Sequence, residues 1–251
     1  MSEQDRNKLQ ELEEENQNLR KTLAQREEFI RKTFGRYLTD EVLEQILEQE
    51  DGAKLPEERR VVTILFMDVR HSTELSEMMS ASDFIRMLNN FLTEMIEIIN
   101  AWQGNILDFV GDSIVAVYGA PRYNEDAARD AVASAVAMQR RMTVVNEWNR
   151  EQGYPEISMG IGIHTGEAVL GNIGSSTRTK YDMIGRNVNL ASRIEGYTAG
   201  GQILISSETL AAAGDRVVIN PNGEMKVRPK GISEDIILHE VVGFGQKTIP
   251  V

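Results

Sequence analysis

One apolar run organises the chain: Val61-Val-Thr-Ile-Leu-Phe-Met67, followed at once by Asp68. Its β-branched and apolar side chains predict a buried β-strand. The run of seven residues is far shorter than the roughly 20 residues that a membrane-spanning helix needs. Asp68 therefore falls at the end of a core strand, where the sheet would hold its carboxylate in a fixed place.

Helix-like and strand-like segments alternate on the C-terminal side of this run. Two short strand patterns flank Gly111-Asp112 as a hairpin, and residues 165–167 are predicted to turn a second hairpin. The predicted helices span 81–102, 125–149 and 185–196, and the predicted strands span 61–67, 105–110, 114–118, 157–164, 168–173, 202–206, 224–227 and 236–242. This order predicts an α+β fold with a ferredoxin-like βαββαβ core, an antiparallel sheet and helices on one face.

A helical heptad pattern occupies the N-terminal part of the chain. Leu9, Asn16 and Leu23 fall at position a, and Leu12 and Leu19 fall at position d. A buried Asn at an a position pairs with its twin across a parallel two-stranded interface, which sets register and strand number. The pattern predicts a parallel coiled coil, and the alternative is a solvated charged helix that caps the domain.

Composition narrows the function classes. The 251 residues hold 27 Lys and Arg against 39 Asp and Glu, a net charge of −12. This balance argues against nucleic acid as a partner, because phosphate backbones are recognised through clustered positive charge. Without cysteine, a disulfide, a thiolate nucleophile and a cysteine metal site are all excluded. No membrane segment or secretory signal is recognisable, so a cytoplasmic location is expected.

Two carboxylates stand where predicted strands end. Asp68 follows the apolar run, and Asp112 sits in the turn of the first hairpin. Two neighbouring carboxylates can share Mg²⁺, and the alternative is that each is a turn or cap residue. The sequence has no phosphate-binding P-loop and no nucleophile elbow. Its three histidines lack the spacing of a zinc site.

Four ordered stretches resemble the catalytic domain of the class III adenylate and guanylate cyclases. They are Ile64–Thr73, Gly104–Gly119, Gly160–Glu167 and Tyr181–Arg193, and the resemblance extends over about residues 58–242. Arg31–Leu47 also resembles the transducing helix that precedes many bacterial cyclase domains. The resulting division is a coiled-coil dimerisation helix (1–37), a transducer helix and linker (38–57), a cyclase catalytic domain (58–245) and a tail (246–251).

The resemblance implies a two-metal site. Asp68 and Asp112 match the family's metal ligands, so they would bind two Mg²⁺ or Mn²⁺ ions, assisted by the backbone carbonyl of Val69. In the family these ions activate the ribose 3′-hydroxyl of a nucleoside triphosphate. That hydroxyl attacks the α-phosphorus, and pyrophosphate leaves.

The resemblance also implies substrate-binding residues on a second subunit. Asn189 would orient the ribose, and Arg193, four residues on and so on the same helix face, would stabilise charge at the α-phosphate. Lys230 would bind phosphate, with Arg228 as a competitor for that assignment. In the family these residues and the metal aspartates come from different subunits, so we expect a homodimer with two composite sites. An upstream sensor would act through the coiled coil.

The base pocket departs from the family pattern. Adenylate cyclases of this family carry a Lys four residues before the second metal aspartate, but here that residue is Asp108, whereas Asp182 matches the second position. Adenine N1 needs a donor and a carboxylate only accepts, so Asp108 favours GTP unless the two acids share a proton. Asp182 and the prevalence of adenylate cyclases among bacterial relatives favour ATP. We expect ATP as the substrate, with guanylate cyclase activity and a non-catalytic nucleotide-binding module as the alternatives.

Overall fold

The structure, a computed structural model, describes residues 3–34, 57–175 and 178–249. The chain divides into two compact units, Met1–Lys54 and Leu55–Val251. The first unit contains one described helix, α1 (Glu3–Phe34), and the second contains the sheet and the remaining described helices. Among the described helices, none has the length and apolar character needed to cross a bilayer. The cytoplasmic location stays a prediction.

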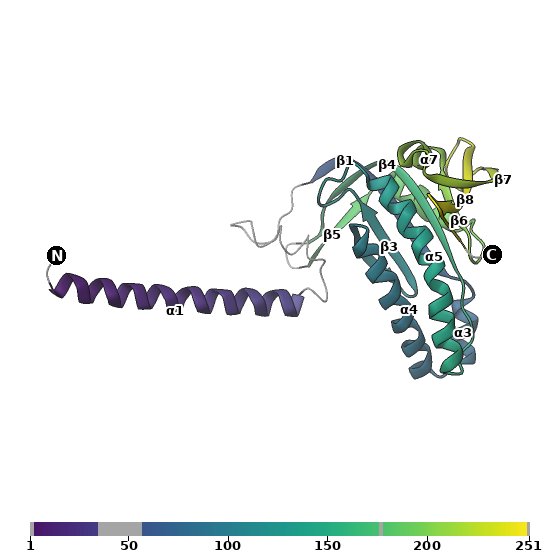
Figure 1. Ribbon diagram of the computed structural model, residues 1–251. Coiled ribbons are helices and arrows are strands. Elements are labelled where there is room, and N and C mark those ends of the chain that lie inside the picture. The colour runs from purple at the N-terminus through teal and green to yellow at the C-terminus, as the bar shows by residue number, and fades with distance from the viewer. Residues whose placement is uncertain (1–2, 35–56, 176–177, 250–251) are drawn as a thin grey trace. The chain divides into compact units, whose positions relative to one another are not determined.

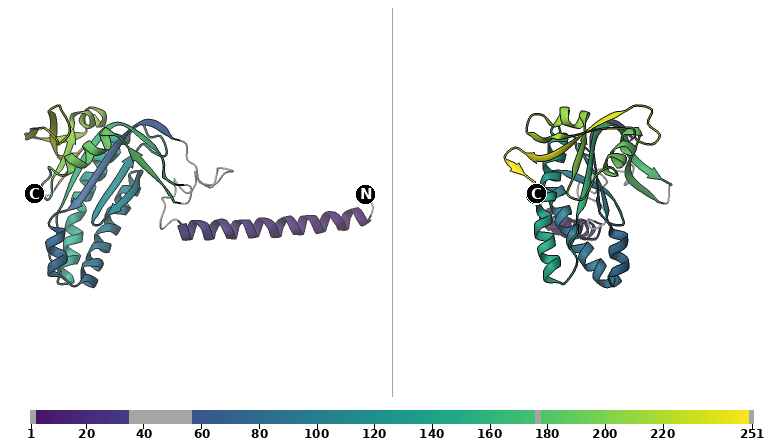
Figure 2. Two further views of the ribbon diagram at one scale, coloured as in Figure 1. Left: turned by 180° about the vertical axis from the view of Figure 1, so that it is seen from behind. Right: turned by 90° about the vertical axis from the view of Figure 1, so that its right-hand side faces the viewer.

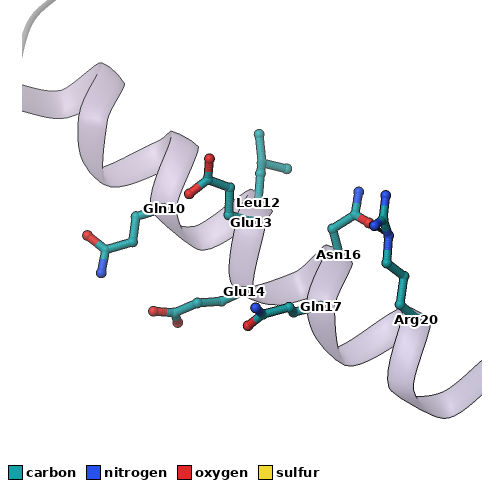
Figure 3. A pocket seen from close by; sticks show the side chains of 7 residues that line it. All are labelled: Gln10, Leu12, Glu13, Glu14, Asn16, Gln17 and Arg20. Carbon is teal, nitrogen blue, oxygen red and sulfur yellow. Dashed lines mark hydrogen bonds between the residues drawn. The ribbon is translucent and has the colours of Figure 1, made fainter.

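Helix α1 carries a stripe of exposed apolar side chains. Leu12, Leu19 and Leu23 each expose more than half of their surface. Asn16 Oδ1 accepts a hydrogen bond from Arg20 Nε at 3.0 Å within the helix. Figure 3 shows the seven side chains that line a pocket along α1, all of which belong to that helix. The pairing of two such helices stays a prediction, and residues 35–56, with most of the predicted transducer segment, lie outside the described residues.

The second unit alternates strands and helices (Figure 1) and contains short helices and strands that were not predicted. Its strands are β1 (Glu58–Val69), β2 (Gly104–Val110), β3 (Ser113–Tyr118), β4 (Met159–Gly174), β5 (Thr179–Ile184), β6 (Ile203–Ser206), β7 (Val217–Val227), β8 (Ile236–Phe244) and β9 (Lys247–Thr248). Its helices are α3 (Ser72–Met78), α4 (Ala81–Ala101), α5 (Ala127–Glu151), α6 (Arg186–Glu195) and α7 (Ser207–Ala213).

One nine-stranded sheet runs through this unit, in the order β2-β3-β1-β4-β6-β8-β7, with β5 paired to β4 and β9 to β8. The apolar run of β1 lies between β3 and β4, antiparallel to both. The first four strands therefore form the predicted ferredoxin-like core. The prediction of an antiparallel sheet was wrong at β6, which runs parallel to β4. The chain crosses over through β5 and α6 between these two strands, and such a crossover returns it in the same direction.

The second predicted hairpin is a single long strand. β4 pairs with β1 without a break from Met159 to Leu170, so residues 165–167 continue the strand. In the sequence, Gly166 predicts a turn. In the fold, it leaves room for the side chain of Asn187, because a Cβ at this position would lie 2.6 Å from that side chain. The hairpin partner of β4 is β5, which the sequence analysis missed.

Helices cover both faces of the sheet, which corrects the prediction of one covered face. α4 and α5 lie against one face, where Phe91 and Met95 join Met67 and Ile161 in the main core (Figures 1 and 2). Strand side chains alternate between faces, so Gly162 points the opposite way from Ile161. A Cβ on Gly162 would lie 2.1 Å from the backbone nitrogen at the end of α6. Helix α6 therefore packs directly on the second face.

Candidate active site

Asp68 lies at the end of β1, on the sheet face that α6 covers. Its side chain is 31% exposed. Its Oδ2 accepts a hydrogen bond from Ser113 Oγ, on the residue that follows Asp112. This contact holds the carboxylate of Asp68 against the β2–β3 turn, so the structure brings the two predicted metal-binding segments together. Val69, the third predicted ligand residue, is the last residue of β1 and is buried.

Asp112 presents a buried oxygen with no partner. Its Oδ2 is inaccessible to solvent and makes no hydrogen bond within the described residues. A buried carboxylate oxygen without a partner is costly, and a bound cation would remove that cost. No cluster of three or more His, Asp or Glu side chains occurs in residues 3–34, 57–175 and 178–249. Two carboxylates fit Mg²⁺, because this ion is usually held by one or two carboxylates together with substrate phosphates.

Arg70 connects this end of β1 to α6, a role that the sequence analysis missed. Its Nη1 lies 4.0 Å from Asp68 Oδ1. Its Nη2 donates to Glu195 and to Thr198 Oγ1, the latter at 3.0 Å. Arg70 stands two residues after Asp68, so its backbone follows the strand while its guanidinium reaches the helix end. The side chain therefore ties the predicted metal-binding end of the sheet to the helix that carries Arg193.

Helix α6 carries the predicted ribose and phosphate residues. Asn189 is exposed, whereas Arg193 is partly buried. Arg193 Nη1 is inaccessible to solvent and has no hydrogen-bond partner within the described part of the chain. The position of a Cβ on Gly231 lies 3.6 Å from this atom, so the loop that contains Lys230 lies beside Arg193. An unpartnered buried guanidinium nitrogen fits an anionic ligand such as phosphate.

The same loop separates the two candidates for phosphate binding. Arg228 Nε donates to Asp235 Oδ1 at 2.6 Å, and Lys226 Nζ lies 3.2 Å from the other oxygen of that carboxylate. The Arg228 pair raises the pKa of Arg228 and lowers the pKa of Asp235. Lys230 is exposed and forms no ion pair with the described residues. The geometry therefore favours Lys230 over Arg228 as the phosphate-binding residue.

A buried histidine supports the start of α6. His164 on β4 lies 2.8 Å from Ser206 Oγ through Nδ1 and 3.1 Å from Asn187 Oδ1 through Nε2. Burial lowers the pKa of His164, although the hydrogen bond with Asn187 and the charge of Glu208 oppose this effect. Asn187 also donates to the backbone oxygen of Glu167 at 2.8 Å. A neutral imidazole thus joins α6 to the central sheet and helps to place Asn189.

The predicted base-pocket residues are brought together by a lysine that the sequence analysis missed. Lys180 on β5 places Nζ 2.7 Å from Asp108 Oδ2 and 3.2 Å from Asp182 Oδ2. The two acids therefore share an ammonium group. No hydrogen bond or ion pair within the described residues joins the metal aspartates to Asn189, Arg193 or Lys230. Each chain thus holds the predicted site as separate parts.

A ferredoxin-like core with two carboxylates at the end of its central strands, and an arginine-bearing helix on the same face, is the architecture of the class III nucleotide cyclases. Residues 55–240 match the family model described as the adenylate and guanylate cyclase catalytic domain. The chain belongs to this family, which confirms the resemblance found in the sequence and the fold class expected from it.

Curated relatives agree with this assignment. Adenylate cyclase 1 of Rhizobium meliloti is 34% identical over 213 residues, which cover 84% of this chain and 32% of the relative. The adenylate cyclase of Anabaena cylindrica is 34% identical over 236 residues, covering 89% of this chain and 44% of the relative. The chain therefore spans between about a third and less than half of the length of these relatives.

Solved structures include both kinds of cyclase. The guanylyl cyclase Cya2 is 43% identical, with a TM-score of 0.75 over 78% of this chain and 100% of the other. The adenylyl cyclase CyaB from P. aeruginosa is 36% identical, with a TM-score of 0.73 over 77% of this chain and 99% of the other. Family membership is thus clear, and these two solved relatives include one cyclase of each kind.

Proposed function

We propose that this chain converts a purine nucleoside triphosphate, preferably ATP, to the 3′,5′-cyclic monophosphate and pyrophosphate. The single observation that carries the proposal is a pair of buried charged atoms without partners in the described chain, Asp112 Oδ2 and Arg193 Nη1. Asp112 Oδ2 needs a cation, and Arg193 Nη1 needs an anion. A metal-bound triphosphate supplies both.

The proposed reaction forms one bond and breaks one bond. The 3′-oxygen bonds to the α-phosphorus, the bond to the bridging α–β oxygen breaks, pyrophosphate leaves, and the hydroxyl proton is released. Asp68 and Asp112, with the carbonyl of Val69, would hold two Mg²⁺ or Mn²⁺ ions. When bound, such ions supply Lewis acidity and neutralise phosphate charge.

The remaining residues bind and orient the substrate. Asn189 orients the ribose so that its 3′-oxygen faces the α-phosphorus, which lowers the entropic part of the barrier. Arg193 donates to the α-phosphate as negative charge builds up there. Lys230 binds the terminal phosphates as a point charge.

We further propose that two copies of the chain complete each site. Within one chain, the carboxylates of Asp68 and Asp112 form no hydrogen bond or ion pair with Arg193 or Lys230 among the described residues. A two-fold homodimer would place the carboxylates of one copy opposite the cations of the other, twice. The exposed stripe of α1 would hold the copies together, and an upstream sensor would change its packing.

ATP is the proposed substrate because the two curated relatives are adenylate cyclases and Asp182 is retained. GTP is the second candidate, since the guanylyl cyclase Cya2 is 43% identical. The test is to incubate the purified protein with Mn²⁺ and each of ATP, GTP, CTP and UTP, and to identify the products by mass. We expect cyclic AMP as the main product. Nucleotide binding without any cyclic product would indicate a non-catalytic module.

A mixing experiment tests the composite site. Asp68→Ala and Arg193→Ala should each be inactive as homodimers, because both of their sites lack an essential residue. In a mixed dimer one of the two sites is intact, so an equimolar mixture that exchanges subunits freely should recover about a quarter of the wild-type rate. Failure to recover activity, with subunit exchange verified by mass spectrometry of the dimers, would contradict the composite arrangement.

A further inference from the structure

Lys180 occupies an unusual place between two acids of the base pocket. It lies on β5, two residues before Asp182, and its ammonium nitrogen bridges Asp182 on its own strand and Asp108 on β2. All three side chains reach solvent, with 41% of Lys180, 49% of Asp108 and 33% of Asp182 exposed. The cluster is therefore accessible to a ligand and is not part of the core.

The two carboxylates are bound in the same way. Oδ1 of Asp108 accepts from the backbone nitrogen of Phe109 at 2.9 Å, and Oδ1 of Asp182 accepts from that of Met183 at 2.9 Å. Each Oδ2 is taken by Lys180. Every oxygen of both groups therefore accepts one hydrogen bond within the chain, and each keeps a second lone pair with which it can accept from a ligand.

Lys180 retains capacity to donate. An ammonium group has three N–H bonds, and the two contacts to Asp108 and Asp182 use two of them. Burial lowers the pKa of Lys180, but the hydrogen bonds and charges of the two acids outweigh burial and raise this pKa above its ordinary value. The side chain is therefore charged at neutral pH, with its third N–H available.

We propose that Lys180 determines the base specificity of this site by donating its third N–H to N1 of adenine while Asp182 accepts from the adenine amino group. The inference rests on the proposed cyclase function. In this chain a cation from β5 supplies the donor that residue 108 does not provide. Selectivity would thus come from a residue outside the two positions that the sequence analysis identified.

The hydrogen-bond pattern of the two purines explains the preference. Adenine presents one acceptor, N1, beside one donor, its amino group, which matches one ammonium beside one carboxylate. Guanine in the same position would present its N1–H donor to Lys180 and its O6 acceptor to Asp182, so both contacts would become unfavourable. Without Lys180, the pocket would contain acceptors only and would match the two neighbouring donors of guanine, N1–H and N2–H.

The test measures both purines in the same variants of the full chain. Lys180→Met should lower the ratio of kcat/KM for ATP to that for GTP by about 10- to 100-fold, the effect expected from losing one charge-assisted hydrogen bond. Lys180→Arg retains a donor and should keep the wild-type preference. Arg141→Gln is the matched control, because it removes an ion pair of similar exposure between α4 and α5. Its ratio should not change.

A binding measurement separates this inference from the proposed function. 3′-Deoxy-ATP and 3′-deoxy-GTP lack the attacking hydroxyl, so their affinities report base recognition without turnover. If the wild-type chain binds these analogues but forms no cyclic product from ATP or GTP, the cyclase proposal fails while the affinity ratio of Lys180→Met still tests the lysine. An unchanged ratio in folded Lys180→Met would overturn the role of Lys180. Absence of any nucleotide binding to the wild type would overturn both proposals.

Discussion

Two carboxylates on one hairpin, Asp108 and Asp112, have opposite surroundings. Asp112 Oδ2 is buried and has no hydrogen-bond partner within the described residues. Asp108 is bound by the backbone of Phe109 and by Lys180. A buried anion without a partner requires a cation or a proton, whereas a paired anion is stable by itself. The predicted metal site therefore needs a ligand, whereas Asp108 in the predicted base pocket already has its partners.

This difference in hydrogen bonding indicates what each of the two regions can bind. The unsatisfied atoms of Asp112 and Arg193, at the predicted metal and phosphate sites, point to the ligands that they need. In the predicted base pocket, the contacts of Lys180 limit what a base can still bind. Substitutions at the predicted metal and phosphate sites should change the rate for every nucleotide. Substitutions in the predicted base pocket should change the preference between nucleotides.

Among these predictions, the largest loss of activity should come from Asp112→Asn. The amide cannot replace an anionic ligand, so kcat should fall by about 100-fold, equivalent to about 3 kcal/mol of barrier. Mn²⁺ should raise the melting temperature of the wild type but not of this variant, because a ligand stabilises only the folded state that binds it.

Asp108→Asn is the control for this prediction, since it changes an acid of the same hairpin that is already paired. It should keep the Mn²⁺-dependent rise in melting temperature. An Asp112→Asn protein with wild-type kcat would show that the unpartnered carboxylate binds no catalytic metal.

A smaller effect is expected from Asp108→Lys. The new ammonium can donate to adenine, so the ATP-to-GTP ratio of kcat/KM should rise. The rise should stay below about 10-fold, because repulsion from the nearby Lys180 opposes the new charge. Parallel assays with both nucleotides measure this ratio. If the ratio does not move, Asp108 does not take part in base recognition.

The smallest effect concerns pH and His164. Its folded-state pKa is lowered, chiefly by burial, so below its ordinary pKa of 6.5 the unfolded chain binds a proton that the folded chain excludes. Stability should therefore be highest above about pH 6.5 and decrease as the pH falls below that value. Thermal melts between pH 8 and pH 5 should show this loss, and His164→Gln should reduce it. An identical pH dependence in both proteins would remove His164 as the cause.

Much of the fold was predictable from local patterns. The apolar run of β1, the helical spacing of α4 and the Gly111-Asp112 turn were correct because each depends on neighbouring residues. The prediction of a hairpin at residues 165–167 was wrong because Gly166 leaves room for the side chain of Asn187, which is distant in sequence, and does not form a turn. The prediction that one sheet face is uncovered was wrong for a similar reason, since α6 packs on that face against Gly162.

The candidate site divides in the same way. Asp68 and Asp112 can be recognised in the sequence because two carboxylates at strand ends can share a metal ion such as Mg²⁺. Arg70 lies inside a recognised motif, yet its contacts with Glu195 and Thr198 span more than 100 residues of sequence. No local pattern indicates such a contact, so its role emerged only from the structure.

The sequence by itself determined the family, the ferredoxin-like core and the residues offered as metal, ribose and phosphate ligands, because these depend on motifs whose order and spacing are visible in one dimension. Only the tertiary structure decided which charges meet. Lys180 and Asp108 are 72 residues apart, and β5 brings them within 2.7 Å. Electrostatic pairing depends on distance in space and not on distance along the chain. The predicted base-pocket residues, which the sequence presents as two acids, therefore form an ion-paired cluster of two acids and one lysine.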